Sequence, residues 1–214
     1  MISLLVDDSD FIHYMANVDE YDENAINEAK KHFKYTTIMG VHLTSLKDTN
    51  DVIKNGLIPY SDDMEYNRVL LNIRLQSYGY NLNEISLISD ACIKRLKEVA
   101  ILPNNIINRV CFSFDEECIT HRGRNVFLEY LGGELVAKAV RDNNIMLKSG
   151  RPYAVYIEIP FNRFYDWGIS SIINICKLKE LGVKPTVSNS SLDCSVEGII
   201  EPEYIIKVEE IKNL

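Results

Sequence analysis

Hydrophobic and polar positions along the chain follow either a two-residue or a helical period, and the two kinds of segment are interspersed. Alternating or β-branched runs predict strands at residues 39–44, 106–114, 153–160, 184–188 and 204–211. Apolar residues at helical spacing predict helices at residues 24–33, 45–55, 125–142 and 168–181, with two more between 62 and 100. This order lacks the regular alternation of a doubly wound sheet, so the predicted fold class is α+β.

The segment from residue 62 to residue 100 is predicted to form a helical hairpin. Gly79 and Asn81 separate its two helices, and Pro103 follows the second. The apolar positions of the first helix are Val69, Leu70, Ile73 and Leu75, and those of the second are Ile85, Ile88, Cys92, Leu96 and Val99. An apolar face on each helix predicts that the hairpin packs on the rest of the protein and leaves a polar face outward.

The chain is predicted to form one main domain. Residues 1–36 are expected to be an N-terminal appendage, and residues 37–214 the domain that contains the hairpin as an insertion. A length of 214 residues suffices for one well-buried domain. No apolar run reaches a membrane-spanning length, and the N-terminus lacks the basic flank and apolar core of a secretory signal.

Composition narrows the functional classes. The formal net charge of −8 argues against strong non-specific nucleic-acid binding, which depends on lysine and arginine, although it leaves room for a local basic groove. The five cysteines are widely spaced and form no CxxC pair, so we expect reduced thiols in the cytoplasm rather than disulfides or a zinc site. Cys111 and Cys176 lie in apolar stretches and are expected in the core. Glycine-rich nucleotide-binding motifs and HExxH are absent from the sequence.

Residues 41–44, Val-His-Leu-Thr, place two polar side chains on a predicted strand. His42 and Thr44 are two residues apart, so their side chains point to the same face of that strand. Ser45 is predicted to begin a helix that ends at Gly56, a residue suited to a left-handed cap. A strand histidine is either a hydrogen-bonded structural residue or a ligand-binding one.

A second pattern surrounds Glu197. A polar loop at residues 188–193 precedes a predicted strand that displays this acidic side chain, and a Glu-Pro turn at residues 201–202 leads into the last predicted strand. Glu197 is either a solvated strand residue or a positioned carboxylate. A positioned carboxylate is able to stabilise the positive charge that develops when a glycosidic bond breaks.

A third pattern lies between these two. Ser113 falls at the end of a predicted strand, and Arg124 opens a predicted helix. Tyr130 and Glu134 are four residues apart, so they share one face of that helix. Each has an ordinary alternative: solvation for Arg124, core packing for Tyr130 and an ion pair with Lys138 for Glu134.

Together these patterns resemble, over about residues 37–210, the motifs of the ADP-ribosyltransferase superfamily. The resemblance implies a split β-sheet core with helical insertions and NAD as the substrate. It implies cleavage of the nicotinamide–ribose bond and transfer of ADP-ribose to a macromolecular acceptor, either a protein or a nucleic acid. The layout is closest to the small members found in bacterial toxins, phage defence and phage counter-defence.

The resemblance also implies roles for particular residues. Glu197 would be the catalytic carboxylate, and His42 with Thr44 would bind the NAD ribose and nicotinamide amide. The other NAD-binding residues that it implies are Ser113, Arg124, Tyr130 and Glu134. Within that set, Arg124 is a candidate for holding the pyrophosphate, and either Tyr130 or Phe112 would stack on the nicotinamide. The hairpin at residues 62–100 would be a lid or an acceptor platform.

One departure and two alternatives remain open. Members that modify arginine carry a second acidic residue or a Gln two positions before the catalytic Glu, where this chain has Ser195. Arginine-directed transfer is therefore not expected, and the acceptor stays open. An RNA 2'-phosphotransferase-like enzyme would need an arginine-rich pocket, with Arg122, Arg124 and Arg151 as candidates. The other alternative is a non-catalytic binding protein of the same fold.

Overall fold

The structure is a computed structural model that describes residues 8–101, 107–114, 135–137, 139, 148, 150–186 and 193–212, without the side chains of residues 166 and 167. Arg124, Tyr130 and Glu134 lie outside the described residues, as does most of the polar loop predicted before Glu197. The predicted helix at residues 125–142 is represented only by 135–137 and 139, which are helical.

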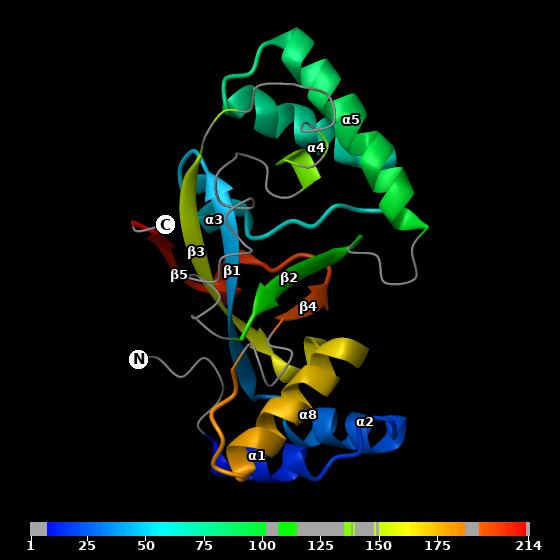
Figure 1. The fold of residues 1–214 in the computed structure, drawn as a ribbon, viewed down its shortest axis with the longest axis vertical. Helices are drawn as coiled ribbons and strands as arrows, with labels where there is room; N and C mark the ends of the chain where they lie inside the picture. The colour runs from blue at the N-terminus through cyan, green and yellow to red at the C-terminus, as the bar shows by residue number, and fades with distance from the viewer. Residues whose placement is uncertain are drawn as a thin grey trace.

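A five-stranded antiparallel sheet forms the centre of the fold (Figure 1). Its strands are β1 (Thr37–Leu46), β2 (Arg109–Ser113), β3 (Arg151–Pro160), β4 (Asp193–Glu197) and β5 (Ile205–Glu210), in the order β4-β2-β1-β3-β5. Helices occur between the strands and before them, and the predicted α+β class is confirmed. Residues 184–186, predicted to begin a further strand, have no regular structure.

The sheet consists of two closely paired parts that meet at one point. β1 and β3 pair along their full lengths, from Thr37 opposite Pro160 to Leu46 opposite Arg151. β1 and β2 pair only at Val41 and Ser113. Figure 1 shows β2 and β4 inclined to the long β1–β3 pair, so the two parts diverge on either side of that contact.

The helix predicted to start at Ser45 starts later. β1 continues through Ser45, which is 1% exposed, to Leu46. α3 spans Asn50–Asn55, and Asp48 Oδ1 accepts a hydrogen bond of 2.9 Å from the Asn50 N–H. Strand pairing and burial therefore override the weak capping signal at Ser45. The predicted end is confirmed, since Gly56 caps α3 with a φ of 76°.

Three helices pack at one end of the sheet. α1 (Ser9–Ala16) contacts α8 (Asp166–Glu180), and α2 (Glu23–His32) lies beside them (Figure 1). Asp8 and Asp22 cap α1 and α2 by accepting backbone N–H bonds. Residues that the sequence assigned to an N-terminal appendage share one buried cluster with the sheet and α8; they include Phe11, Met15, Ala29 and Phe33.

The predicted hairpin is confirmed as α4 (Met64–Ser77) and α5 (Leu82–Ala100). Its buried side chains form a second cluster that includes Leu71, Leu75, Ile88, Cys92 and Leu96, together with Ile107, Leu135, Val136 and Ala139. The apolar face predicted for α4 is wrong in part, because Val69 and Ile73 are 56% and 61% exposed. Contact with α5 instead selects the helix face of Leu71 and Leu75, which are four residues apart.

Two further expectations concern single side chains and membranes. Cys176 is buried as predicted, whereas Cys111 is exposed. Val110 and Phe112 occupy the inward positions of β2, so Cys111 between them faces the other way. Within the described part of the chain, no helix combines the length and the apolar character needed to cross a membrane.

Candidate functional site

His42 lies where the two parts of the sheet diverge. Its Nδ1 is 2.7 Å from the carbonyl oxygen of Cys111 on β2. On the far side of β2, Cys111 pairs with Ser195 of β4, two residues before Glu197. The His42 side chain thus joins β1 to β2, and β2 in turn pairs with β4, the strand that ends at Glu197.

This contact fixes the form of the imidazole. A carbonyl oxygen only accepts, so Nδ1 must carry the proton and donate it. Burial lowers the pKa of His42, and the bond to Cys111 opposes that effect only in part. His42 is therefore neutral near pH 7, and its Nε2 has a lone pair able to accept a hydrogen bond from a hydroxyl group.

The register places the predicted site residues on two faces, with Ser113 and Glu197 on the face of Val41 and with His42 and Thr44 on the other face. Ser113 lies opposite Val41, so it shares a face with Val41, and His42 and Thr44 point to the other side of β1. Ser113 is 1% exposed, which makes it part of the wall between β1 and β2. Thr44 is half-buried opposite Tyr153 of β3.

Glu197 ends β4 with an exposed side chain. Arg109 of β2 stands directly opposite, so a cation and a carboxylate are neighbours on the same face. Within the described ranges, the Glu197 carboxylate makes no hydrogen bond or ion pair; the residue's one described bond is through its backbone carbonyl. An uncommitted carboxylate next to an arginine is available to a ligand.

Backbone hydrogen bonds connect the turn after Glu197 to the segment that follows α3. Leu57, which follows Gly56, exchanges bonds of 2.9 and 3.0 Å with Ile200. Gly198 N–H donates to the Asn108 carbonyl at 2.7 Å, and Asn108 N–H donates to the Tyr60 carbonyl at 2.6 Å. The segment between α3 and the hairpin therefore runs against the turn that follows the predicted catalytic residue.

Arg163 holds the same turn from the other side. It lies in η2, the 3-10 turn Phe161–Arg163 after β3. Its Nη1 donates to Glu201 Oε2 at 2.6 Å, and its Nη2 donates to the carbonyls of Ile199 at 2.6 Å and Glu197 at 3.3 Å.

Sequence patterns did not indicate Arg109, Asn108 or Arg163. Of the three, only Asn108 has a residue type that hints at its conformation. Asparagine tolerates the left-handed backbone that it adopts here, with a φ of 59°. Arg109 is next to Glu197 only through the β2–β4 register, and Arg163 reaches the turn only through the fold. Neither relationship has a fixed sequence spacing.

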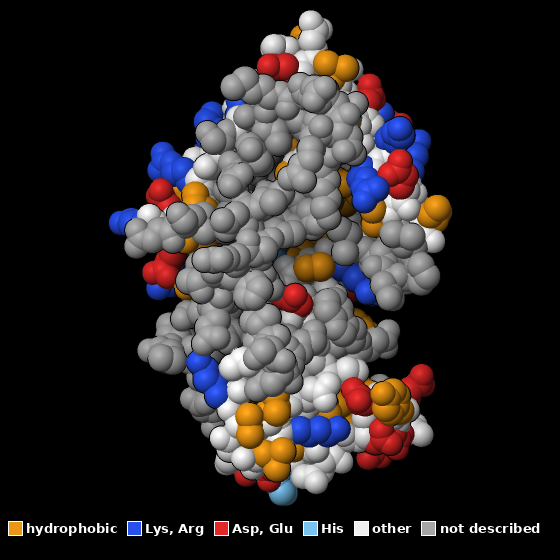
Figure 2. Space-filling view, viewed as in Figure 1, with side chains coloured by type: hydrophobic (Ala, Val, Ile, Leu, Met, Phe, Trp, Pro, Cys, Tyr) orange, Lys and Arg blue, Asp and Glu red, His pale blue; other side chains and the backbone are white. Residues whose placement is uncertain are grey.

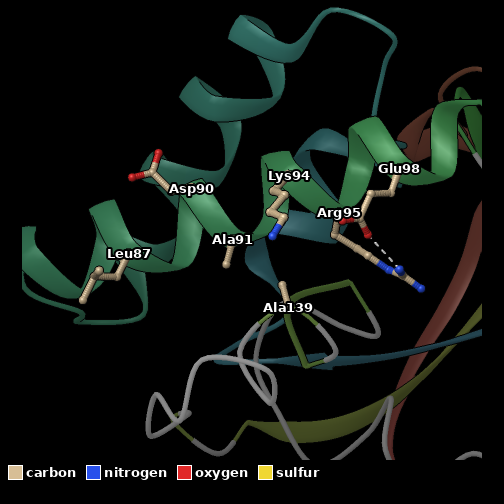
Figure 3. A pocket seen from close by; sticks show the side chains of 7 residues that line it. All are labelled: Leu87, Asp90, Ala91, Lys94, Arg95, Glu98 and Ala139. Carbon is tan, nitrogen blue, oxygen red and sulfur yellow. Dashed lines mark hydrogen bonds and ion pairs between the residues drawn. The ribbon is translucent and has the colours of Figure 1, made fainter.

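The outer face of α5 carries an open groove of about 360 Å³ (Figure 3). It is lined by Leu87, Asp90, Ala91, Lys94, Arg95 and Glu98, with Ala139 opposite. Arg95 pairs with Glu98 at 2.9 Å and Asp90 with Arg68 at 2.6 Å. Lys94 points towards Ala139 in Figure 3 and has no ion-pair partner in the part of the chain that the structure covers. Basic and acidic side chains are interspersed over this end of the molecule (Figure 2).

Other chemistries find little support among the described side chains. In those ranges, no group of three or more His, Cys, Asp or Glu residues is placed to hold a metal ion. Burial raises the pKa of the Cys92 and Cys176 thiols to about 12, so neither forms a thiolate nucleophile near pH 7.

The fold and these contacts define an α+β protein with a carboxylate-bearing turn between two parts of a divided sheet. Comparison with protein families and with curated proteins finds no match. Among solved structures, the chain is similar to EcPltA, with a TM-score of 0.39 and 12% identity over 82% of this chain and 77% of that chain. None of these comparisons assigns a family, so a functional proposal depends on the residues themselves.

Proposed function

We propose that this chain is an NAD-dependent ADP-ribosyltransferase that cleaves the nicotinamide–ribose bond and transfers ADP-ribose to a macromolecular acceptor. The observation that carries the proposal is the setting of Glu197. Its carboxylate is exposed and uncommitted among the described residues, while its backbone is bonded to Arg163 and the next residue to Asn108. A free carboxylate on a fixed backbone suits electrostatic stabilisation of a developing cation.

The reaction breaks the bond between ribose C1' and the nicotinamide nitrogen, and nicotinamide leaves with the electron pair. The ribose then carries oxocarbenium-like positive charge, which the Glu197 carboxylate stabilises. A nucleophile of the acceptor forms the new bond to C1' and loses a proton. Where water takes the acceptor's place, the products are nicotinamide, ADP-ribose and a proton.

His42 binds a ribose hydroxyl in this proposal. Its Nδ1–H is committed to the Cys111 carbonyl, so Nε2 accepts a hydrogen bond from the sugar. Thr44 assists from the same strand face. Ser113 lies in the wall between β1 and β2 and supports the NAD pocket there. The NAD-binding roles of Arg124, Tyr130 and Glu134 are proposed from the resemblance alone.

The acceptor is a protein or a nucleic acid, recognised by the hairpin of α4 and α5. Cleavage of NAD requires no insertion of this size, and the hairpin begins a few residues after Leu57, which is bonded to the turn of Glu197. Ser195 stands where an arginine-modifying enzyme would carry a second acidic or Gln residue, which directs the proposal away from arginine. A role in toxin action or phage–host conflict belongs to the same proposal.

The test is incubation of the whole chain with NAD labelled on the adenylate, with and without a bacterial lysate. Released nicotinamide together with label on a macromolecule supports the proposal. Binding of NAD without release would indicate a non-catalytic member of the same fold. If NAD is neither bound nor cleaved, the proposal is wrong. If NAD is bound without release, an RNA carrying a 2'-phosphate, supplied with NAD, tests the phosphotransferase alternative, which also uses NAD.

A further inference from the structure

We infer that Arg163 is a positioning residue that holds the Glu197 carboxylate at its working place. The inference rests on the proposed function for its consequence in catalysis, but the contacts that carry it are independent of that function. Arg163 bonds to the peptide carbonyl of Glu197 itself, to that of Ile199 and to the carboxylate of Glu201.

The three acceptors are successive points of one chain reversal. Gly198 turns the backbone with a φ of 79°, and Pro202 begins the next 3-10 turn. Glu197 belongs to the last β2–β4 pair, and Ile199 lies two residues beyond it. Arg163 donates hydrogen bonds to the carbonyl oxygens of both residues.

Arginine is suited to this task by its shape. One planar guanidinium reaches three oxygens, and its carbon lies 5.5 Å from the ring centre of Tyr204. Its side chain is 22% exposed, while the bonds to the carbonyls of Glu197 and Ile199 lie at the surface. A lysine ammonium is a single point charge without this planar fork and is not expected to satisfy the same three acceptors.

The base of Arg163 is anchored in the core. The flanking aromatic residues Phe161 and Phe164 are fully buried, and the Phe161 N–H donates to the Thr36 carbonyl at 2.9 Å, just before β1. Phe164 in turn packs against Phe112 of β2. Through Arg163, the Glu197 turn is therefore fastened to the buried centre of the sheet rather than to a surface loop.

A positioning role predicts a particular pattern of loss. The described bonds of Arg163 go to the turn after Glu197 and not to His42, so its removal should leave NAD affinity within about twofold. Displacing a reacting group by about 1 Å can cost roughly 100-fold in rate. The Arg163→Met and Arg163→Lys variants should therefore lower kcat by about 10- to 100-fold with little change in the dissociation constant of NAD.

The experiment has two arms on the full chain. Nicotinamide release and calorimetric NAD titration measure kcat and affinity for wild type, Arg163→Met, Arg163→Lys and the control Arg151→Met. Arg151 lies at the start of β3, the strand before η2, and its ion pair with Glu210 is exposed and 3.8 Å long. Hydrogen exchange of the Gly198 and Ile200 amides measures how firmly the turn after Glu197 is held, and it does so independently of activity. Both Arg163 variants should exchange faster by at least tenfold, and Arg151→Met should not.

The outcomes separate the two ideas. Faster exchange with lower kcat and unchanged NAD affinity supports the inference. Unchanged exchange in folded Arg163 variants overturns it, whether or not the wild type cleaves NAD. Faster exchange with wild-type kcat also overturns it, because the turn would then be held without any effect on Glu197. A wild type that cleaves no NAD rejects the proposed function and this catalytic role, while the exchange arm still decides whether Arg163 holds the turn.

Discussion

Leu57 and Ile200 exchange two backbone hydrogen bonds, and so connect the segment that follows the His42 strand to the turn that follows Glu197. Gly56 makes this contact feasible. A Cβ at Gly56 would lie 2.1 Å from the Ile200 carbonyl oxygen, and the φ of 76° is one that side chains disfavour. The close approach of the two segments thus depends on one missing methyl group.

Gly56→Ala should destabilise the protein and weaken NAD binding together. Gly182→Ala is the matched control, since Gly182 has a φ of 69° but open space around its Cβ position. The control should lose about 1–2 kcal/mol of unfolding free energy from backbone strain alone. Gly56→Ala should lose more, because the backbone must also move. Equal losses in urea unfolding, with NAD affinity unaffected, would contradict the proposed closeness of Leu57 and Ile200.

Glu197→Gln should reduce nicotinamide release by on the order of 100-fold or more, the scale for removing one electrostatic stabiliser. NAD affinity and the thermal midpoint should stay near the wild-type values, since the carboxylate has no bonded partner among the described residues. Glu203→Gln, a change at an exposed acidic residue in the following 3-10 turn, is the control and should retain activity. Near-normal turnover by Glu197→Gln would remove it from the catalytic role.

The lowered pKa of His42 predicts how the stability of the protein depends on pH. Its pKa is lowered in the folded protein, whereas the unfolded chain binds a proton near pH 6.5. Below about pH 6.5 the unfolded state therefore binds more protons, and wild-type stability should fall as the pH drops towards the lowered value, by at most about 1.4 kcal/mol per pH unit from this group.

The variant His42→Asn separates the titration from the hydrogen bond. An Asn side-chain amide keeps a donor for the Cys111 carbonyl but does not titrate. Urea unfolding at pH 7.5 and 5.5 should show a smaller loss on acidification for this variant than for wild type. NAD affinity at pH 7.5 should also fall, because the Nε2 acceptor is gone. An identical pH dependence in both proteins would show that His42 does not titrate as its burial implies.

Charge reversal on the hairpin tests acceptor recognition. Arg68 and Arg74 are unsuitable positions, because Arg68 bonds to Asp90 and the charge of Arg74 acts on the Tyr60 hydroxyl, where it opposes the rise in pKa that burial causes. Lys94 is exposed beside the groove of α5 (Figure 3). Lys94→Glu should lower transfer of label to the acceptor at least severalfold and leave NAD hydrolysis unchanged. Lys31→Glu on α2 is the control. If Lys94→Glu lowers hydrolysis and transfer equally, the hairpin acts on the NAD site instead.

Periodicity was sufficient for most of the fold. The strands that carry His42 and Glu197 and both helices of the hairpin could be predicted, because each has a clear apolar pattern of its own. Ser45 and Val69 show where this reasoning fails. The pairing of Ser45 with Pro152 extends β1, and contact with α5 selects which face of α4 is buried. Both outcomes depend on partners distant in sequence.

The candidate site was predictable only in its most exposed part. Glu197 could be proposed from the sequence because it is the one acidic side chain displayed by a predicted strand after a polar loop. Its neighbours Arg109 and Arg163 could not, since strand register and a turn from another part of the chain bring them there. The inequivalent faces of His42 and Ser113 likewise follow from the register between β1 and β2.

The two largest buried clusters are separate, and this has a consequence for how such a protein diverges. The hairpin packs mainly on itself and on a few residues from 107 and 135–139, while the sheet and its end helices share the other cluster. Substitutions in the outward faces of α4 and α5 therefore leave the packing beneath His42 and Glu197 untouched. On the proposed function, the hairpin surface could therefore change with its acceptor while the packing around His42 and Glu197 is kept, and a hairpin grafted from a related chain would change the acceptor without altering the NAD-cleaving residues.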